Sequence, residues 1–421
     1  MGGEITYQTP PEAPLGDPHK DASSRSTWAK ENLFATARDT IISIVMGSAL
    51  LAVMFITARF VLVTARWEVI YRNVTNLLVG AFPRDDLNLV WIMLFLVVVG
   101  IGLMIGAAHT LVAQADDDDI LESPQSEQVV SAARRFAPLI LFVLTLLMMA
   151  REARFAALGM ILAIGVFGWS ARTFGLKVRR ERANLAVGAG ALLLVGAFIF
   201  LAANVGWDDW GGLLLTVFLA GSAIVLCFPF GVLAALGRRS DLPVMRMFSV
   251  GYIELIRGVP LITLLLVGSL MLRFFLPENL APSAVSRAII MITLFSGAYV
   301  AEIVRGGLQA VHPGQSEAAR ALGLPKTKEM RLIVLPQALR NVIPALVGQF
   351  ISLFKDTSLV VIIGLRELLG VTQNFTKQPE FNGTGVEAEV LVLAAFVYWV
   401  IAFTMSRESQ RLETRLGVGT R

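Results

Sequence analysis

Apolar segments of about 20 residues recur along this 421-residue chain and constrain its fold more than any other feature. A helix of that length crosses the ~30 Å hydrocarbon core of a bilayer. These segments lie at 41–63, 89–113, 185–204, 213–236, 250–276, 286–306, 341–364 and 387–405. A shorter pair, 136–150 and 155–171, forms either a hairpin of two short spans or one re-entrant element. We therefore expect an all-α integral membrane protein of about ten spans, or eight if the pair does not cross.

Composition excludes several other classes of protein. The chain is 55% hydrophobic and only 16% charged, whereas a soluble domain carries about 25% charged residues. A soluble enzyme, a disordered chain and a disulfide scaffold are therefore excluded. Cys227 is the sole cysteine, and His19, His109 and His312 lie far apart, so no metal site is expected. The net charge of +4 is explained by cationic loops rather than by nucleic-acid binding.

The distribution of loop charge predicts the orientation. Lys and Arg gather in cytoplasmic loops of membrane proteins. Here the cationic loops are 172–182, 238–246, 307–340 and 407–421, and they alternate with acidic or mixed ones. Both ends of the chain are therefore expected inside the cell. Residues 1–40 are predicted to form a polar, mostly disordered cytoplasmic tail, and residues 409–421 form a second cytoplasmic tail.

The segment 307–340 is a polar stretch between two spans and is too long for a structureless loop. Ser316 is expected to cap a short helix that begins at Glu317, where an acid suits the positive end of the helix dipole. Gly323 permits the left-handed conformation that ends such a helix, and Pro325 prevents it from resuming. Alanines on this helix leave a smooth face that a partner protein can approach closely.

The same segment carries a resemblance. Glu317-Ala318-Ala319, then Gly323, then Ile333-Val334-Leu335-Pro336 resemble the EAA loop of bacterial ABC importer permeases. The flanking stretches 211–216, 254–260, 301–307 and 355–359 are similar to the polar-amino-acid (histidine/glutamine-type) permeases. This resemblance covers about 207–408. The long N-terminal half, with Trp67, Asn73 and residues 77–80, looks like the longer permease subunit of general L-amino-acid importers.

The resemblance implies a type I ABC importer-like transmembrane domain with a five-helix core at 207–408 and additional transmembrane helices at 41–205. Such a chain is not an enzyme. It is a multi-pass permease subunit of the bacterial inner membrane that moves polar or general L-amino acids by alternating access. The loop 307–340 would couple it to an ATPase through a set of residues in that loop. The set is Glu317, Ala318, Ala319, Gly323, Leu335 and Pro336.

The partners implied are a cytosolic ABC ATPase dimer, a second homologous permease subunit and a periplasmic amino-acid-binding protein. ATP would be bound by the ATPase, because this chain has no Gly-x-x-x-x-Gly-Lys-Ser/Thr phosphate loop. We therefore expect no cofactor in the chain itself.

Lys355 and Asp356 interrupt an apolar span. An ionisable group there costs at least about 2.5 kcal/mol, so it needs a partner or a water-filled cavity. Gln349 and Ser352 share a helical face with Asp356. One hypothesis is that this face lines the substrate path, with Asp356 attracting the ammonium group and Lys355 or Gln349 the carboxylate. The other is that Lys355 and Asp356 hold neighbouring helices together. The candidate path residues are Gln349, Ser352, Lys355, Asp356, Thr357 and Ser358.

Two copies of a charged pattern, Glu254-x-x-Arg257-Gly and Glu302-x-x-Arg305-Gly, lie at the ends of two spans that face the cytoplasm. Each Glu is expected to meet its own Arg, or the two pairs cross-link two helices. They form either a structural network or a cytoplasmic gate that breaks during inward opening.

Two rival functions are an ion-coupled secondary amino-acid transporter and a membrane sensor or scaffold. The first would need repeats with broken helices and ionisable spans in both halves, which residues 41–204 do not contain. The second would have no need of the charges at 355 and 356. An ATPase and a binding protein encoded beside this chain would favour the importer.

Overall fold

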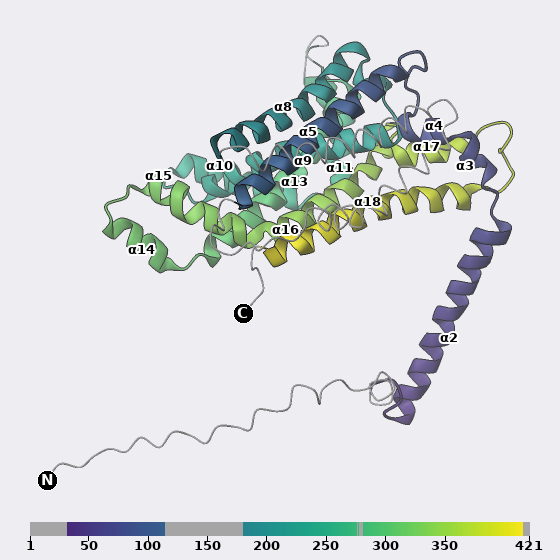
Figure 1. Cartoon of the computed structure of the whole chain (residues 1–421), viewed down its shortest axis with the longest axis horizontal. Helices are drawn as coiled ribbons and strands as arrows, with labels where there is room; N and C mark the ends of the chain where they lie inside the picture. Colours follow the sequence, from purple (N-terminus) through teal and green to yellow (C-terminus); the bar gives the residue numbers. More distant parts are fainter. Residues whose placement is uncertain (1–31, 114–179, 276, 278–280, 416–421) are drawn as a thin grey trace. The chain divides into compact units, whose positions relative to one another are not determined.

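The computed structural model describes residues 32–113, 180–275, 277 and 281–415 (Figure 1). Within these ranges the regular structure is helical, apart from one isolated parallel β-bridge between Gly212 and Glu367. The expected all-α fold is thereby confirmed. The chain divides into two compact units, Met1–Arg66 and Trp67–Arg421, and each is described by itself. The expected short pair at 136–150 and 155–171 lies outside the described residues.

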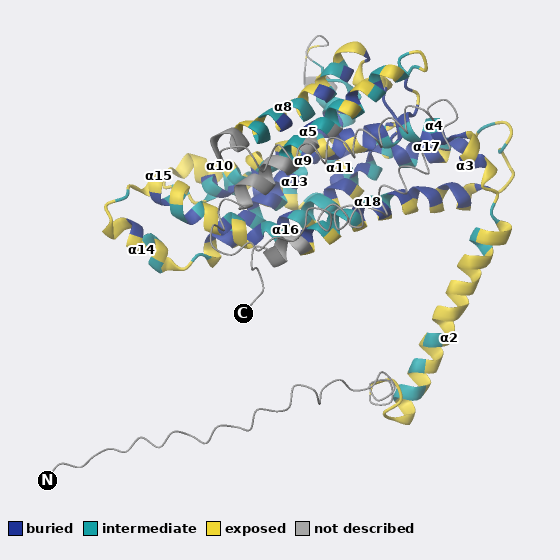
Figure 2. Cartoon of the chain, viewed as in Figure 1, coloured by how far each residue is buried: buried dark blue, intermediate teal, exposed yellow. Residues whose placement is uncertain are grey.

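The described part of the first unit is one long helix. It comprises α2 (Ala37–Arg59) and a π-helical end, η1 (Phe60–Thr64). The Thr36 hydroxyl caps its start by accepting a hydrogen bond from the Asp39 amide at 3.1 Å. None of its residues is buried within the chain (Figure 2). A helix this apolar on every side requires an apolar solvent, and the hydrocarbon of a bilayer provides it.

The second unit is a bundle of long helices joined by short ones (Figure 1). Its elements are α3 (Glu68–Arg72), α4 (Val74–Val79), α5 (Leu87–Ala113), α8 (Arg180–Asn204), η2 (Trp207–Asp209), α9 (Gly212–Arg238), α10 (Pro243–Arg257), α11 (Leu261–Leu270), α12 (Leu272–Phe275), α13 (Ala284–Ala310), α14 (Pro313–Ala321), α15 (Lys326–Glu329), η4 (Met330–Val334), α16 (Leu335–Asp356), η5 (Thr357–Ile363), α17 (Leu368–Phe375) and α18 (Glu387–Arg415).

In the described part of the chain, six helical segments have the length and composition to cross a membrane. They are Ala37–Thr64, Leu185–Asn204, Gly212–Arg238, Ala284–Ala310, Lys326–Ile363 and Glu387–Gln410. A bent pair, α10 and α11, makes a seventh if its two halves form one span. The total of ten spans stays a prediction, because residues 114–179 are not described.

The expected single helix over 250–276 is wrong. The chain forms α10 and α11 instead, whose axes meet at 104° across a break of three residues. Pro260 lies in that break and has no amide hydrogen to donate, and its ring disfavours helical geometry at Val259. The 27-residue stretch is apolar enough to suggest one span, yet its proline divides it.

The core of the second unit is formed by α9, α13, α16 and α18, and α5 packs along α8. Glycines bring the helices close together. A methyl group at Gly231 of α9 would lie 2.7 Å from the carbonyl oxygen of Gly297 on α13. A methyl group at Gly190 of α8 would lie 2.6 Å from the carbonyl oxygen of Gly100 on α5.

Three backbone stretches meet at a junction formed by Gly80, Gly211 and Gly212. The Gly211 amide donates to the Val79 carbonyl at 3.1 Å, and the Gly212 amide donates to the Arg366 carbonyl at 2.9 Å. Gly80 and Gly212 have φ of +64° and +57°, which side chains rarely adopt. The junction attaches the end of α4 to the start of α9 and to the stretch before α17. The division of the chain near residue 206 stays a prediction.

We predict that Gly212→Ala lowers the free energy of unfolding by about 3 kcal/mol, because the new methyl group has a strained φ and overlaps the Leu77 carbonyl. Thermal unfolding of the purified chain in detergent measures this loss. Gly221→Ala on the same helix is the control, since a methyl group there meets nothing within 4 Å. Equal unfolding midpoints for the two variants would contradict the prediction.

Candidate functional site

The short helix expected in the segment 307–340 exists, but it begins earlier than predicted. α14 starts at Pro313, and the Nδ1 atom of His312 accepts a hydrogen bond from the Gly314 amide at 3.1 Å. The expected cap at Ser316 and start at Glu317 are therefore wrong. Proline is favoured at the first helical position, because its fixed φ suits a helix and its missing amide hydrogen is not needed there.

The end of α14 agrees with the sequence. Gly323 adopts φ of +73°. Its amide donates to the Arg320 carbonyl at 2.9 Å, and the Leu324 amide donates to the Ala319 carbonyl at 3.1 Å. This pair of bonds is the Schellman arrangement, which satisfies the last carbonyl groups of a helix and favours glycine.

The predicted coupling residues do not share one surface. Glu317 and Ala318 are exposed on α14, whereas Ala319 is buried. Leu335 and Pro336 begin α16 instead of lying on α14. Leu322, expected at the end of the short helix, is its C-cap residue, and 80% of it is exposed beside the alanines. One exposed face of α14 is small and apolar, formed by Ala318 and Ala321 with the C-cap residue Leu322. The charged Glu317 and Arg320 are exposed beside this face.

Side-chain contacts attach this segment to the bundle. Gln337 Nε2 donates to Gln315 Oε1 at 3.2 Å and so connects α16 to α14. Lys326 Nζ lies 2.7 Å from Asp241 Oδ2 in the turn between α9 and α10. The hydrogen bond from Lys326 holds the pKa of Asp241 below its ordinary value. Both side chains of this ion pair are exposed, so it orients the segment more than it stabilises it.

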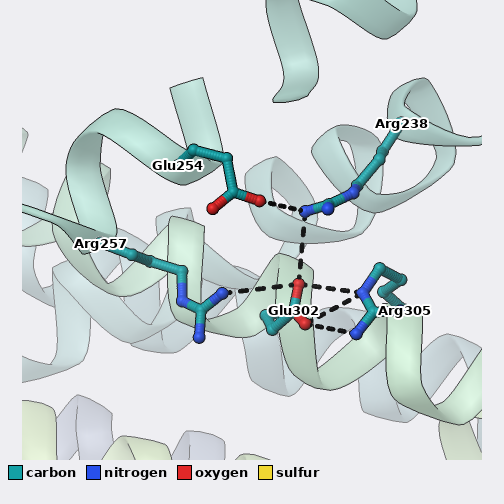
Figure 3. A network of polar contacts seen from close by, with 5 residues as sticks. All are labelled: Arg238, Glu254, Arg257, Glu302 and Arg305. Carbon is teal, nitrogen blue, oxygen red and sulfur yellow. Dashed lines mark hydrogen bonds and ion pairs between the residues drawn. The ribbon is translucent and has the colours of Figure 1, made fainter. Parts of the chain in front are cut away.

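The two Glu-x-x-Arg patterns meet in one network of charges (Figure 3). Glu302 accepts from Arg305 on its own helix at 2.5 Å, and lies 3.7 Å from Arg257 of α10. Glu254 pairs with Arg238 of α9 at 3.0 Å instead of with its own Arg257. Arg238 also lies 3.5 Å from Glu302. The network thus cross-links α9, α10 and α13. Glu302 meets its own Arg305 and also Arg257 of the other pattern, whereas Glu254 pairs with Arg238 of a third helix.

Glu302 is the centre of this network. Three guanidinium groups surround its carboxylate, and its side chain is only 23% exposed, against 58% for Glu254. Arg257 also lies over the ring of Tyr299, 5.6 Å from its centroid, an arrangement that favours a cation. Sequence reasoning missed Arg238 as a member, because 64 residues separate it from Glu302.

The candidate path residues lie at the end of α16. Gln349, Ser352, Lys355 and Asp356 belong to this helix, which ends at Asp356, and Thr357 and Ser358 begin the 3₁₀ helix η5. The expected single helix over 341–364 therefore starts six residues earlier, at Leu335, and tightens after Asp356. Ser352 and Lys355 are exposed, Asp356 is half-buried and Thr357 is buried.

Glu367 was missed by the sequence reasoning. Its side chain is fully buried. Its Oε1 atom accepts from the Gly370 amide at 2.9 Å, and its Oε2 atom accepts from Tyr398 Oη at 2.7 Å and from Thr216 Oγ1 at 3.3 Å. Burial raises the pKa of Glu367, and the hydrogen bond from Tyr398 opposes that rise. The available signal was a carboxylate that, with Arg366 beside it, interrupts an apolar stretch after Gly364.

Within the described ranges, no group of three or more His, Cys, Asp or Glu side chains is arranged to hold a metal ion.

Residues 227–418 match the family of binding-protein-dependent transport system inner membrane components. The chain is 48% identical over 227 residues to the inner membrane amino-acid ABC transporter permease protein YhdY of Escherichia coli, with 54% of this chain and 61% of that protein covered. It is 46% identical over 210 residues to the glutamate/glutamine/aspartate/asparagine transport system permease protein BztC of Rhodobacter capsulatus, with 50% and 48% covered.

A shorter relative is matched almost completely. The chain is 37% identical over 211 residues to the probable glutamine ABC transporter permease protein GlnP of Bacillus subtilis, with 49% of this chain and 92% of that protein covered. The chain therefore belongs to the family of binding-protein-dependent transport system inner membrane components, which are transport subunits and not themselves enzymes. The matches span only 61% and 48% of YhdY and BztC. The resemblance to ABC permeases is confirmed.

We predict that Glu302→Gln lowers the free energy of unfolding by about 2 kcal/mol, because three arginines lose their shared carboxylate. Glu254→Gln, at the exposed edge of the same network, is expected to cost less than about 0.5 kcal/mol. Thermal unfolding of both variants in detergent measures the difference. A larger loss for Glu254→Gln would show that Glu302 is not the centre of the network.

Proposed function

We propose that this chain is the transmembrane permease subunit of an ATP-driven importer of amino acids. Its family membership supports a transport role. The names of the relatives YhdY, BztC and GlnP support amino acids as the substrate class. Energy would come from a separate ATPase dimer that binds ATP, and solute from a periplasmic binding protein. A second homologous permease would complete the path.

The exposed face of α14 is the observation that carries this proposal. α14 projects from one end of the second unit (Figure 1). It is capped at both ends, and Ala318, Ala321 and the C-cap residue Leu322 are exposed. A leucine that is 80% exposed on a polar segment is suited to a pocket on a partner protein. The alanines beside it allow close approach. An ATPase groove that accepts this face would bind α14 as a rigid unit.

Motion of α14 would reach the proposed path through α16. Gln315 and Gln337 connect the two helices, and α16 continues from Leu335 to Asp356. A displacement of α14 therefore reorients the helix that carries Lys355 and Asp356. The charge network centred on Glu302 lies at the same end of the bundle as α14. We propose that the ion pairs of this network break when the path opens inward, so that α9, α10 and α13 can move apart.

An amino acid carries an ammonium group and a carboxylate, and the end of α16 offers a charge of each sign. Asp356 would attract the ammonium group, and Lys355 the carboxylate. Gln349 and Ser352 lie on the same face as Asp356 and offer hydrogen bonds. Selection among amino acids would fall mainly to the binding protein.

We predict that Leu322→Asp abolishes ATPase binding and ATP-dependent uptake, because a carboxylate replaces the apolar side chain that enters the partner. The measurement has two parts. Pull-down of the complex reports ATPase retention, and proteoliposomes with and without ATP report uptake of a panel of amino acids.

Lys328→Ser is the matched control, since Lys328 is exposed on the same segment but lies outside the α14 face. It is expected to retain the ATPase. If Leu322→Asp retains the ATPase as Lys328→Ser does, α14 is not the docking element. If the unaltered complex moves no amino acid with ATP, the importer function itself is wrong.

We predict that Asp356→Asn reduces uptake about tenfold, because a neutral amide loses the charge-assisted hydrogen bond to the substrate ammonium. ATPase retention is expected to stay at the level of the unaltered complex, since Asp356 lies at the opposite end of α16 from α14. Unchanged uptake would exclude Asp356 from the path and favour its role between helices.

A further inference from the structure

The segment 357–367 follows directly after Lys355 and Asp356, so its position decides where the end of α16 lies. It begins with the 3₁₀ helix η5 and turns at Gly364, where φ is +86°. Its last turn has the Gly364 amide donating to Val361 at 3.0 Å and the Leu365 amide donating to Val360 at 3.3 Å. Such short-range bonds shape the segment but do not attach it to the bundle.

One side chain of α18, that of Tyr398, contacts Glu367 at the end of this segment and Phe354 in the last turn of α16, just before its start. At the start, its ring packs on the ring of Phe354, with centroids 5.3 Å apart and planes inclined by 54°. Thr357 is buried beside them and donates to the Phe354 carbonyl at 2.6 Å. At the end, the Tyr398 hydroxyl donates to Glu367 at 2.7 Å. Tyr398 therefore connects Glu367, at the end of the segment, to the last turn of α16, which precedes the segment.

Glu367 extends this attachment to two more elements. Its carboxylate caps α17 through the Gly370 amide and accepts from Thr216 of α9. The Thr216 hydroxyl also accepts from the Leu368 amide at 3.0 Å. The backbone beside Glu367 is bridged in parallel to Gly212. Glu367, Tyr398 and Thr216 form a set that we call the carboxylate clamp.

A carboxylate suits this arrangement. The Gly370 amide donates to one oxygen and the Tyr398 hydroxyl to the other. The Thr216 hydroxyl lies 3.3 Å from the second oxygen and 3.1 Å from the Gly212 carbonyl. An ionised carboxylate has acceptor sites for all three donors without any of them turning, whereas the amide nitrogen of a glutamine could only donate, so the hydroxyls would have to reorient. A fully buried charged group is tolerated only when such hydrogen bonds compensate its desolvation. The chain thus keeps a buried carboxylate, whose removal from water is unfavourable, at the point where α9, α17 and α18 meet the end of α16.

We propose that Glu367 is a positioning residue for transport. The carboxylate clamp fixes the segment 357–367 and thereby fixes where Lys355 and Asp356 lie on the path. This inference rests on the proposed function for the role of those two residues. α17, which Glu367 caps, lies at the end of the second unit away from α14 (Figure 1), so the clamp acts on the path and not on ATPase docking.

The first test is hydrogen–deuterium exchange of the full chain within its purified complex. Tyr398→Phe keeps the ring contact with Phe354 and removes only the hydroxyl. We expect about tenfold faster exchange of amides in 357–367 for Tyr398→Phe and for Glu367→Gln, the effect of losing one hydrogen bond. Peptides of α14 are expected to be unchanged. Unchanged exchange in 357–367 overturns the clamp.

The second test compares uptake with ATP hydrolysis in proteoliposomes that contain the assembled complex, with radiolabelled L-glutamine and L-glutamate as probes. In Tyr398→Phe and Glu367→Gln, Lys355 and Asp356 would be misplaced on the path. We expect uptake to fall about tenfold in both variants, while ATP hydrolysis continues at the original rate. A merely structural loss lowers both in proportion. Thr216→Ser keeps the hydroxyl and is expected to keep uptake, whereas Thr216→Val is expected to lose it.

Trp399→Phe and Thr404→Val on α18 are the matched controls, and both are expected to behave as the unaltered chain. Faster exchange with unchanged uptake in Tyr398→Phe and Glu367→Gln overturns the positioning role. If the unaltered complex imports no amino acid, the proposed function fails, and the clamp is then judged by exchange alone. Uptake and hydrolysis that fall together also overturn the proposal.

Discussion

The second unit depends on one constraint, namely that hydrocarbon offers no water to hydrogen-bond the backbone. Helices meet it internally, which is why the described residues are almost wholly helical. Where the chain leaves helical geometry, other groups complete the pairing. The Gly211 and Gly212 amides find the Val79 and Arg366 carbonyls, and glycine is required there because the backbones approach so closely. Glu367 follows the same rule with a side chain, since three donors surround its buried carboxylate.

The two ends of the bundle solve the problem of charge differently. At the α14 end, Arg238, Arg257 and Arg305 gather around half-exposed or shielded carboxylates, and water remains close enough to hydrate them. At the other end, the Glu367 side chain is fully buried, and neutral hydrogen-bond donors take the place of water around its carboxylate. Ion pairs of the first kind can separate at moderate cost because water replaces the partner. Hydrogen bonds of the second kind cannot, so that end is suited to a fixed role.

Local features were predictable from the sequence, and features formed between distant residues were not. The end of α14 was predicted because Gly323 and Pro325 act on their own neighbours. The prediction of its start was wrong because His312 and Pro313, which precede Ser316, also form a helix start, and proline is favoured at the first helical position. The 104° bend between α10 and α11 was missed because hydropathy over 250–276 records length and not direction. Glu367 was missed because Thr216 lies 151 residues away.

Both ends of α14 are specified by residues inside or directly beside it, from the imidazole of His312 to the glycine at 323. The groups that cap this helix therefore come from the chain itself. A force applied to α14 would be passed to the chain on either side of it through an element whose two ends are held by hydrogen bonds.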